Sequence, residues 1–351
     1  MTVFTLLKAV LLATTVYAAA VPRSELVARQ STCPNDAGNA GTFSQPCSTY
    51  SAAIACPNGI QGKAGGIVFL VHGTSGSPQG TWANGPYVQL LPSAGPGFDV
   101  CWVTLPSAAL GDAQATAEYV AYGIKYLAAK SKTGKVGLVS HSQGGLNVQW
   151  ALDFWPAYRS MVSAFVGIAP DFHGTGEGPL ACLAENITLG GCQPSIIQQT
   201  IGSHFLGALL SKGNQALVPT TSIFTSYDEI IQPENGPVTS QLSGASNIRV
   251  QTYCGAGDTV EHTEIPYASY PYFLAVDALS RGAPANPAAV PFSGCSWALS
   301  GNYLQLFQNG IGLLSEDLTA AATTLTAMRT KTEPLLRPYV CARGDASSYC
   351  S

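Results

Sequence analysis

The chain has 351 residues, of which 46% are hydrophobic and only 10% are charged, and its formal net charge is −4. This composition is typical of a globular protein with enough apolar material for one large core. It contains no basic cluster and no interleaving of basic with aromatic residues, which argues against a nucleic-acid partner and against charge steering of a strongly ionic substrate.

The N-terminus has the pattern of an export signal. Lys8 precedes an apolar run over residues 9–17, and Ala18, Ala19 and Ala20 offer small residues for cleavage. A short polar stretch ending at Arg29 predicts a second processing step. The predicted parts are a signal peptide, a propeptide and a single catalytic domain, over residues 1–20, 21–29 and 30–351. No later stretch is long and apolar enough to span a bilayer, so we expect a secreted, extracellular protein without stable membrane insertion.

Ten cysteines in an exported chain, an even number, predict five disulfides rather than metal sites. Proximity in the sequence suggests three pairs: Cys33–Cys47, Cys182–Cys192 and Cys341–Cys350. The pairing of the other four stays open at this point, because connectivity does not follow from sequence: Cys56, Cys101, Cys254 and Cys295. The acceptor sequence at Asn186 predicts a glycosylated surface loop.

Strand-like and helix-like segments alternate through the middle of the chain. The predicted strands are almost continuously apolar and cover residues 66–72, 98–104, 135–140, 164–169, 221–226 and 249–254. Residues 112–130, with Asp112 as the N-cap, and residues 144–155 have apolar side chains at helical spacing. This alternation predicts a doubly wound α/β fold with a buried, mostly parallel sheet flanked by helices.

Two segments fall outside the alternation. Residues 174–194 are rich in glycine, and we expect them near the carboxyl edge of the sheet, where ligands bind in such folds. We interpret them as a lid or rim loop, and a glycosylated surface loop without a role at the site is the alternative. Residues 303–328 have an apolar stripe that predicts a long C-terminal amphipathic helix, which serves the core, a substrate wall or both.

The segment Val-Ser-His-Ser-Gln-Gly-Gly, residues 139–145, stands where a predicted strand ends and a predicted helix begins. A serine at a sharp strand-to-helix turn between small residues is typical of a nucleophile elbow. Ser140 occupies the position that is glycine in the general motif. The pattern nominates Ser142 as a nucleophile, and a structural serine that caps the helix is the alternative.

A serine nucleophile needs a histidine base and an acid that orients it, and in α/β-hydrolases both follow the serine in the chain. Of the five histidines, His262 fits best, because it lies in a polar loop after the last predicted strand. Asp228 follows directly after a predicted strand and is our choice for the acid. The rivals are Asp258, four residues before the histidine, and Glu229, which follows Asp228.

Oxyanion donors are expected in the glycine-containing turn over residues 72–76, after the first long strand. Thr74 offers its amide and its hydroxyl there, and the amide of Gln143, the residue after the nucleophile, supplies the second donor. A simple strand-ending turn is the alternative.

From residue 56 to residue 339 the chain resembles the Candida antarctica lipase B family. The resemblance rests on ordered segments at residues 73–74, 140–145, 169–171, 218–221, 226–233, 333–334 and 337–339. It implies an α/β-hydrolase fold and an ester hydrolase with the triad Ser142, Asp228 and His262 and oxyanion donors at Thr74 and Gln143. It therefore favours Asp228 over Asp258.

The resemblance also implies the surroundings of the site. It assigns Ile230 and Ile231 to the acyl wall, sets Asp171 and Gln199 near the pocket, and implies the pairs Cys56–Cys101 and Cys254–Cys295. His141 departs from the tryptophan that the family lipase carries at this position beneath the alcohol part of the substrate. The smaller, polar imidazole predicts a roomier subpocket and a changed enantiopreference.

These patterns predict a secreted lipase that hydrolyses triacylglycerols and other carboxylic esters through an acyl-enzyme. The alternative within enzymes is an esterase or acyltransferase for short, aromatic or polymeric esters, and the alternative from another class is a silent binding protein with a hydrolase fold. The implied chemistry requires neither a metal nor an organic cofactor. The expected partner of a monomeric enzyme is an ester or lipid substrate, including one presented at a lipid–water interface.

Overall fold

A computed structural model describes residues 31–182, 190–295 and 329–350. All of these residues except residue 31 belong to the compact unit Thr32–Ser351. The predicted signal peptide and propeptide, the sequon at Asn186 and the predicted helix over residues 303–328 lie outside the described residues.

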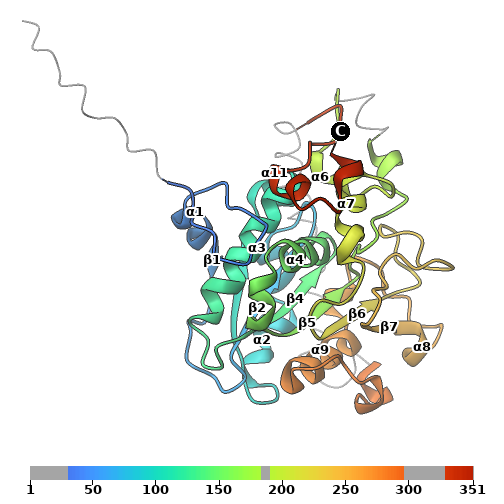
Figure 1. Cartoon of the computed structure of the whole chain (residues 1–351). Helices are drawn as coiled ribbons and strands as arrows, with labels where there is room; N and C mark the ends of the chain where they lie inside the picture. The colour runs from blue at the N-terminus through green and yellow to red at the C-terminus, as the bar shows by residue number, and fades with distance from the viewer. Residues whose placement is uncertain (1–30, 183–189, 296–328, 351) are drawn as a thin grey trace, which may run out of the picture. The chain divides into compact units, whose positions relative to one another are not determined.

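A seven-stranded sheet has the spatial order β1-β3-β2-β4-β5-β6-β7 (Figure 1). All neighbours are parallel except β1 and β3, which are antiparallel. The mostly parallel sheet is therefore confirmed. The strands are β1 (Ile54–Ala55), β2 (Ile67–Val71), β3 (Asp99–Val103), β4 (Val136–His141), β5 (Val162–Ile168), β6 (Thr220–Phe224) and β7 (Ser246–Arg249).

Helices cover both faces of the sheet (Figure 1). The α-helices are α1 (Cys47–Ala52), α2 (Pro86–Gln89), α3 (Ala113–Ala128), α4 (Gln143–Phe154), α6 (Pro194–Gln199), α7 (His204–Gly213), α8 (Val250–Cys254), α9 (Ser269–Arg281) and α11 (Pro338–Ala342). The predicted cap Asp112 accepts a hydrogen bond from the amide of Gln114 at the start of α3. Side chains of α3, α4 and α7 pack into one apolar core, and those of α2 and α9 pack into the other.

Strand β2 shows why its sequence is apolar at every position. Ile67, Phe69 and Val71 belong to the core under α3 and α4, whereas Val68 and Leu70 belong to the core under α9. Successive side chains of a strand point to opposite faces, so a strand covered on both faces needs an uninterrupted apolar run. Because of these uninterrupted apolar runs, the central strands can be predicted from the sequence.

The prediction for the sixth strand was wrong. Residues 249–254 were expected to be extended, but β7 ends at Arg249, and α8 occupies the segment that follows. Its neighbour β6 ends at Phe224, which pairs with Arg249, so the chain beyond has no strand beside it. The side chain of Gln251 instead accepts from the Ser226 amide and donates to Thr225 Oγ1 and the Asp258 carbonyl.

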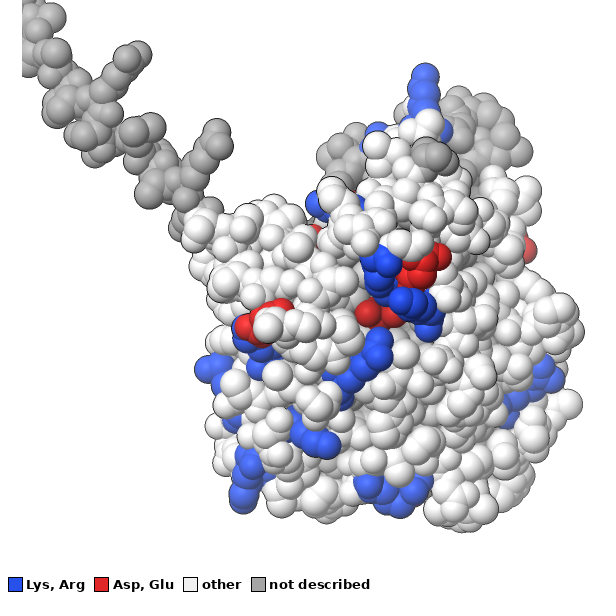
Figure 2. Space-filling model, in the orientation of Figure 1, with Lys and Arg blue, Asp and Glu red and all other residues white. Residues whose placement is uncertain are grey.

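Five disulfides join Cys33–Cys47, Cys56–Cys101, Cys182–Cys192, Cys254–Cys295 and Cys341–Cys350. Charged side chains are sparse on the face shown in Figure 2, as the low charge content predicts. Among the residues described, no helix combines the length and the apolar character that crossing a membrane requires.

Candidate active site

Ser142 sits at a strained turn between β4 and α4, with φ 56° and ψ −132°. Its side chain makes no capping hydrogen bond to the helix, which disfavours a plain capping role. Glycine is required beside it: a Cβ on Gly73 would lie 2.6 Å from the Ser142 Cβ, and a Cβ on Gly144 would lie 2.6 Å from the Val71 carbonyl oxygen. This strand, strained turn and helix have the geometry of a nucleophile elbow.

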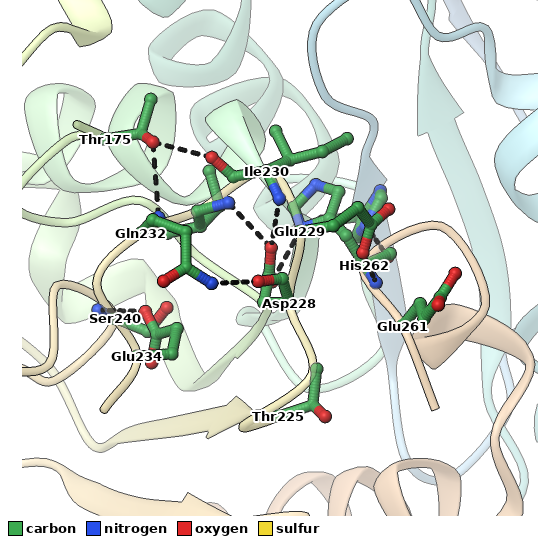
Figure 3. A network of polar contacts seen from close by, with 12 residues as sticks. Thr175, Thr225, Asp228, Glu229, Ile230, Gln232, Glu234, Ser240, Glu261 and His262 are labelled. Atoms are coloured by element: carbon green, nitrogen blue, oxygen red, sulfur yellow. Dashed lines mark hydrogen bonds and ion pairs between the residues drawn. The ribbon is translucent and has the colours of Figure 1, made fainter. Parts of the chain in front are cut away.

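Asp228 and His262 form a buried pair. His262 Nδ1 lies 2.8 Å from Asp228 Oδ2, while Asp228 Oδ1 accepts the amides of Ile230 and Ile231 at 3.0 and 2.6 Å. Figure 3 shows the Asp228 carboxylate between the Ile230 amide and the His262 imidazole. When the Nδ1–H group donates a hydrogen bond to the carboxylate, the neutral ring has Nε2 free as an acceptor, and this is the tautomer that a general base requires. Ser142 and His262 line the same cavity.

Opposing effects act on the pKa of His262. Burial alone would lower it, but the charge and the hydrogen bond of Asp228 outweigh burial, with help from Glu229 and Asp171, and raise this pKa above its ordinary 6.5. The surroundings thus favour the imidazolium that forms when the ring accepts a proton. The neutral base is correspondingly lost as the pH falls below this raised pKa.

The two rival acids occupy other positions. Asp258 Oδ1 accepts the Val260 amide at 3.2 Å, so this carboxylate stabilises its own turn. Glu229 Oε2 accepts the backbone amide of His262 at 2.9 Å. Its contact with the main chain of the histidine was missed in the sequence, where Glu229 was considered only as a rival for the acid.

The turn after β2 brings Thr74 beside two glutamines. Thr74 Oγ1 lies 2.7 Å from Gln143 Oε1 and 3.1 Å from Gln199 Oε1, and Gln199 Nε2 donates to the Ser195 carbonyl at 2.9 Å. Within the described part of the chain, the backbone amides of Thr74 and Gln143 have no hydrogen-bond acceptor. Two free amides and an adjacent hydroxyl beside a serine can stabilise an oxyanion.

Comparison with known proteins identifies the family. No family model matches the chain. The chain is 32% identical to lipase B of Pseudozyma antarctica over 321 residues, which cover 90% of each protein. The chain belongs to the lipase B family. The crystal structure of Aspergillus fumigatus lipase B is also similar, with 35% identity and a TM-score of 0.78 over 89% of this chain and 76% of that one. The α/β-hydrolase fold and the class of carboxylic ester hydrolase are thereby confirmed.

In this lipase B family member, the cavity at Ser142 has a volume of about 290 Å³. Four residues that the resemblance assigned to the pocket lie on its wall: His141, Gln199, Ile230 and Ile231. Thr175, Glu177, Gly178 and Ala181 also line it, so the described part of the predicted rim loop borders the site. Asp171 is not on this wall, because it is fully buried.

Two buried carboxyl groups near Asp228 take no part in the expected chemistry. Burial raises the pKa of Asp171 to about 7, and the negative charge of Asp228 also raises it. Burial likewise raises the pKa of Glu234 to about 7, although Glu234 Oε1 accepts bonds from Thr239 Oγ1 and the Ser240 amide, both at 3.0 Å. The sequence did not single out Glu234, because its burial depends on the loop between β6 and β7 (Figure 3).

The substitution Asp171→Asn is expected to make stability less sensitive to pH. The folded chain retains the Asp171 proton up to about pH 7, whereas the unfolded chain loses it near 3.8, so the wild-type free energy of unfolding falls as the pH rises between these values. The asparagine variant lacks this loss, which is on the order of 4 kcal/mol. Urea unfolding at about pH 4 and about pH 8 measures the difference. Equal pH dependence of both proteins would contradict ionisation of Asp171 as its source.

Proposed function

We propose that this protein is an exported serine lipase that hydrolyses triacylglycerols and other carboxylic esters. His262 takes the Ser142 proton, and Ser142 Oγ attacks the ester carbonyl while the amides of Thr74 and Gln143 hold the oxyanion. His262 then gives the proton to the leaving alcohol, and a water activated by the same ring hydrolyses the acyl-enzyme. The observation that carries the proposal is the Asp228–His262 pair, on the cavity that holds the strained Ser142.

The Thr74 hydroxyl has one proton and lies near two glutamine oxygens. It can therefore join the oxyanion hole only by turning its proton away from these oxygens. The backbone amides need no such rearrangement, since neither is engaged by another described residue. We propose that the amides supply the preorganised part of the hole and the hydroxyl a third donor when the oxyanion forms.

The cavity wall supports an ester with an apolar acyl part. Ile230 and Ile231 lie on the wall beside the acid turn, and Ile196 and Ala181 extend the apolar surface. An acyl chain gains stability there by removing apolar area from water. Esterases and acyltransferases for short, aromatic or polymeric esters use the same catalytic groups, so the preferred chain length distinguishes these functions.

Export of the protein also belongs to the proposal. The five disulfides support an oxidising compartment. We propose cleavage after residue 20, removal of residues 21–29, a monomeric catalytic domain over residues 30–351, and a glycan on Asn186.

A hydrolysis series tests this function. The secreted protein is assayed on p-nitrophenyl esters of increasing chain length and on triacylglycerols below and above their solubility limit. A lipase hydrolyses long-chain esters and emulsified triacylglycerol, whereas activity confined to short soluble esters would favour an esterase. Absence of hydrolysis together with no labelling of Ser142 by an active-site phosphonate would favour a silent binding protein.

A further inference from the structure

His141 is the last residue of β4 and directly precedes Ser142. Its Nε2 lies 2.9 Å from the backbone carbonyl oxygen of His262, and the two imidazole rings are 4.8 Å apart between centroids. A carbonyl oxygen only accepts hydrogen bonds, so His141 Nε2 must carry a proton. His141 is thus a second histidine with an assigned tautomer beside the expected base.

The ring of His141 is neutral. Burial lowers its pKa well below the ordinary 6.5, and the neighbouring His262 lowers it further, against the smaller effect of the bond to the His262 carbonyl. A neutral imidazole with a proton on Nε2 has none on Nδ1, which is therefore a hydrogen-bond acceptor. The fold consequently holds an acceptor at a known atom.

This acceptor is available to a substrate. Within the described ranges, no protein group donates a hydrogen bond to Nδ1 of His141. This atom is also not fully buried, unlike the unpaired polar atoms of the interior. The side chain of His141 lies on the wall of the cavity, and the residue keeps 9% of its surface exposed. Nδ1 is therefore reached through the cavity that contains Ser142.

The position of His141 relates this acceptor to the alcohol part of an ester. His262 has to deliver a proton to the leaving alcohol oxygen, so this oxygen lies within hydrogen-bond reach of the His262 ring during catalysis. The ring of His141 packs against that ring. A hydroxyl on the carbon next to the ester-bearing carbon is only three bonds from the leaving oxygen, so it can reach an acceptor on the neighbouring ring, and it has a proton to donate.

We propose that His141 Nδ1 accepts a hydrogen bond from a second hydroxyl group on the alcohol part of the substrate. This inference rests on the proposed function and makes it more specific: the site prefers partial esters of polyols, in which a free hydroxyl neighbours the ester, over esters of simple alcohols of equal size. The hydroxyl loses water on binding, and the otherwise unpaired acceptor compensates for this loss.

Two butanoate esters of matched size test the preference. In 2-hydroxyethyl butanoate and propyl butanoate the acyl part is identical, and the alcohol parts differ by a hydroxyl in place of a methyl group. We compare the ratio of their kcat/KM values in the wild type, His141→Gln and His141→Phe. Glutamine can still donate to the His262 carbonyl through Nε2 but has no acceptor at the place of Nδ1, whereas phenylalanine removes both interactions.

The wild-type ratio is expected to exceed that of either variant by about 3- to 10-fold, as one neutral hydrogen bond predicts. Comparing ratios cancels the intrinsic reactivities of the esters, and His204→Gln, at an exposed histidine outside the cavity, should leave the ratio unchanged. Equal ratios in the wild type and His141→Gln would overturn the inference while both esters are still hydrolysed. Hydrolysis of neither ester by the wild type would instead overturn the proposed function.

Discussion

Replacing Ser142 with alanine is expected to lower kcat for ester hydrolysis by about 10⁵- to 10⁶-fold, as removal of a serine nucleophile does in serine hydrolases. Alanine keeps the small side chain that the turn requires, so the fold should remain intact. The remaining rate would come from substrate binding and the oxyanion amides. The measurement is kcat on a soluble p-nitrophenyl ester, together with phosphonate labelling, which the variant should lose.

Ser140→Ala is the matched control for this experiment. Ser140 is buried in β4, two residues before Ser142, and its substitution by alanine also removes a side-chain hydroxyl. The control should retain phosphonate labelling and most of its activity. A Ser142→Ala enzyme that retained turnover, or a Ser140→Ala enzyme that lost labelling, would contradict the assignment of the nucleophile.

The second large effect is expected from Asp228→Asn, which should lower kcat by about 10⁴-fold. The asparagine Oδ1 can still accept the amides of Ile230 and Ile231, so the turn is retained. An amide nitrogen facing His262 Nδ1 would favour the tautomer with its proton on Nε2, where it blocks proton acceptance from Ser142. The measurement is kcat at a pH above the raised pKa of His262, so that protonation of the base does not obscure the result.

Asp258→Asn and Glu229→Gln complete the comparison of the three candidate acids. Asp258→Asn should stay near the wild-type rate, because its carboxylate bonds to Val260. Glu229→Gln should cost much less than Asp228→Asn, because the amide oxygen of glutamine can still accept from the His262 backbone. If Asp258→Asn lost as much activity as Asp228→Asn, the assignment of Asp228 as the triad acid would be contradicted.

Sequence patterns predicted the central strands well because a strand that is buried on both faces is apolar at successive positions. In β2 every residue belongs to one of the two cores, and the apolar run shows it. The prediction for residues 249–254 failed because the end of β7 depends on where β6 ends. The sequence of residues 249–254 contains no information on that neighbouring strand.

The candidate site residues could be predicted because the order of strands and loops along the chain leaves few candidates for each role. An acid after one strand, a histidine in a later loop and a serine at a turn follow from the order of the fold, and the structure brings Ser142 and His262 to one cavity, with Asp228 bonded to His262. The contact of Glu229 with the His262 backbone and the burial of Glu234 depend on how loops fold against each other. No local pattern reports such contacts, so both were missed.

The turn that contains Asp228 and Glu229 contacts His262 at two points. Two adjacent carboxylates hold a single histidine, one through its ring and the other through its main chain. A movement that displaced the histidine segment would have to break both contacts or carry the acidic turn with it. Thr175 of the rim is tied to the same turn, because its hydroxyl donates to the Ile230 carbonyl and accepts from the Gln232 amide. A rim that moved to admit a bulky ester would therefore pull on the segment that holds His262, unless these two bonds broke first.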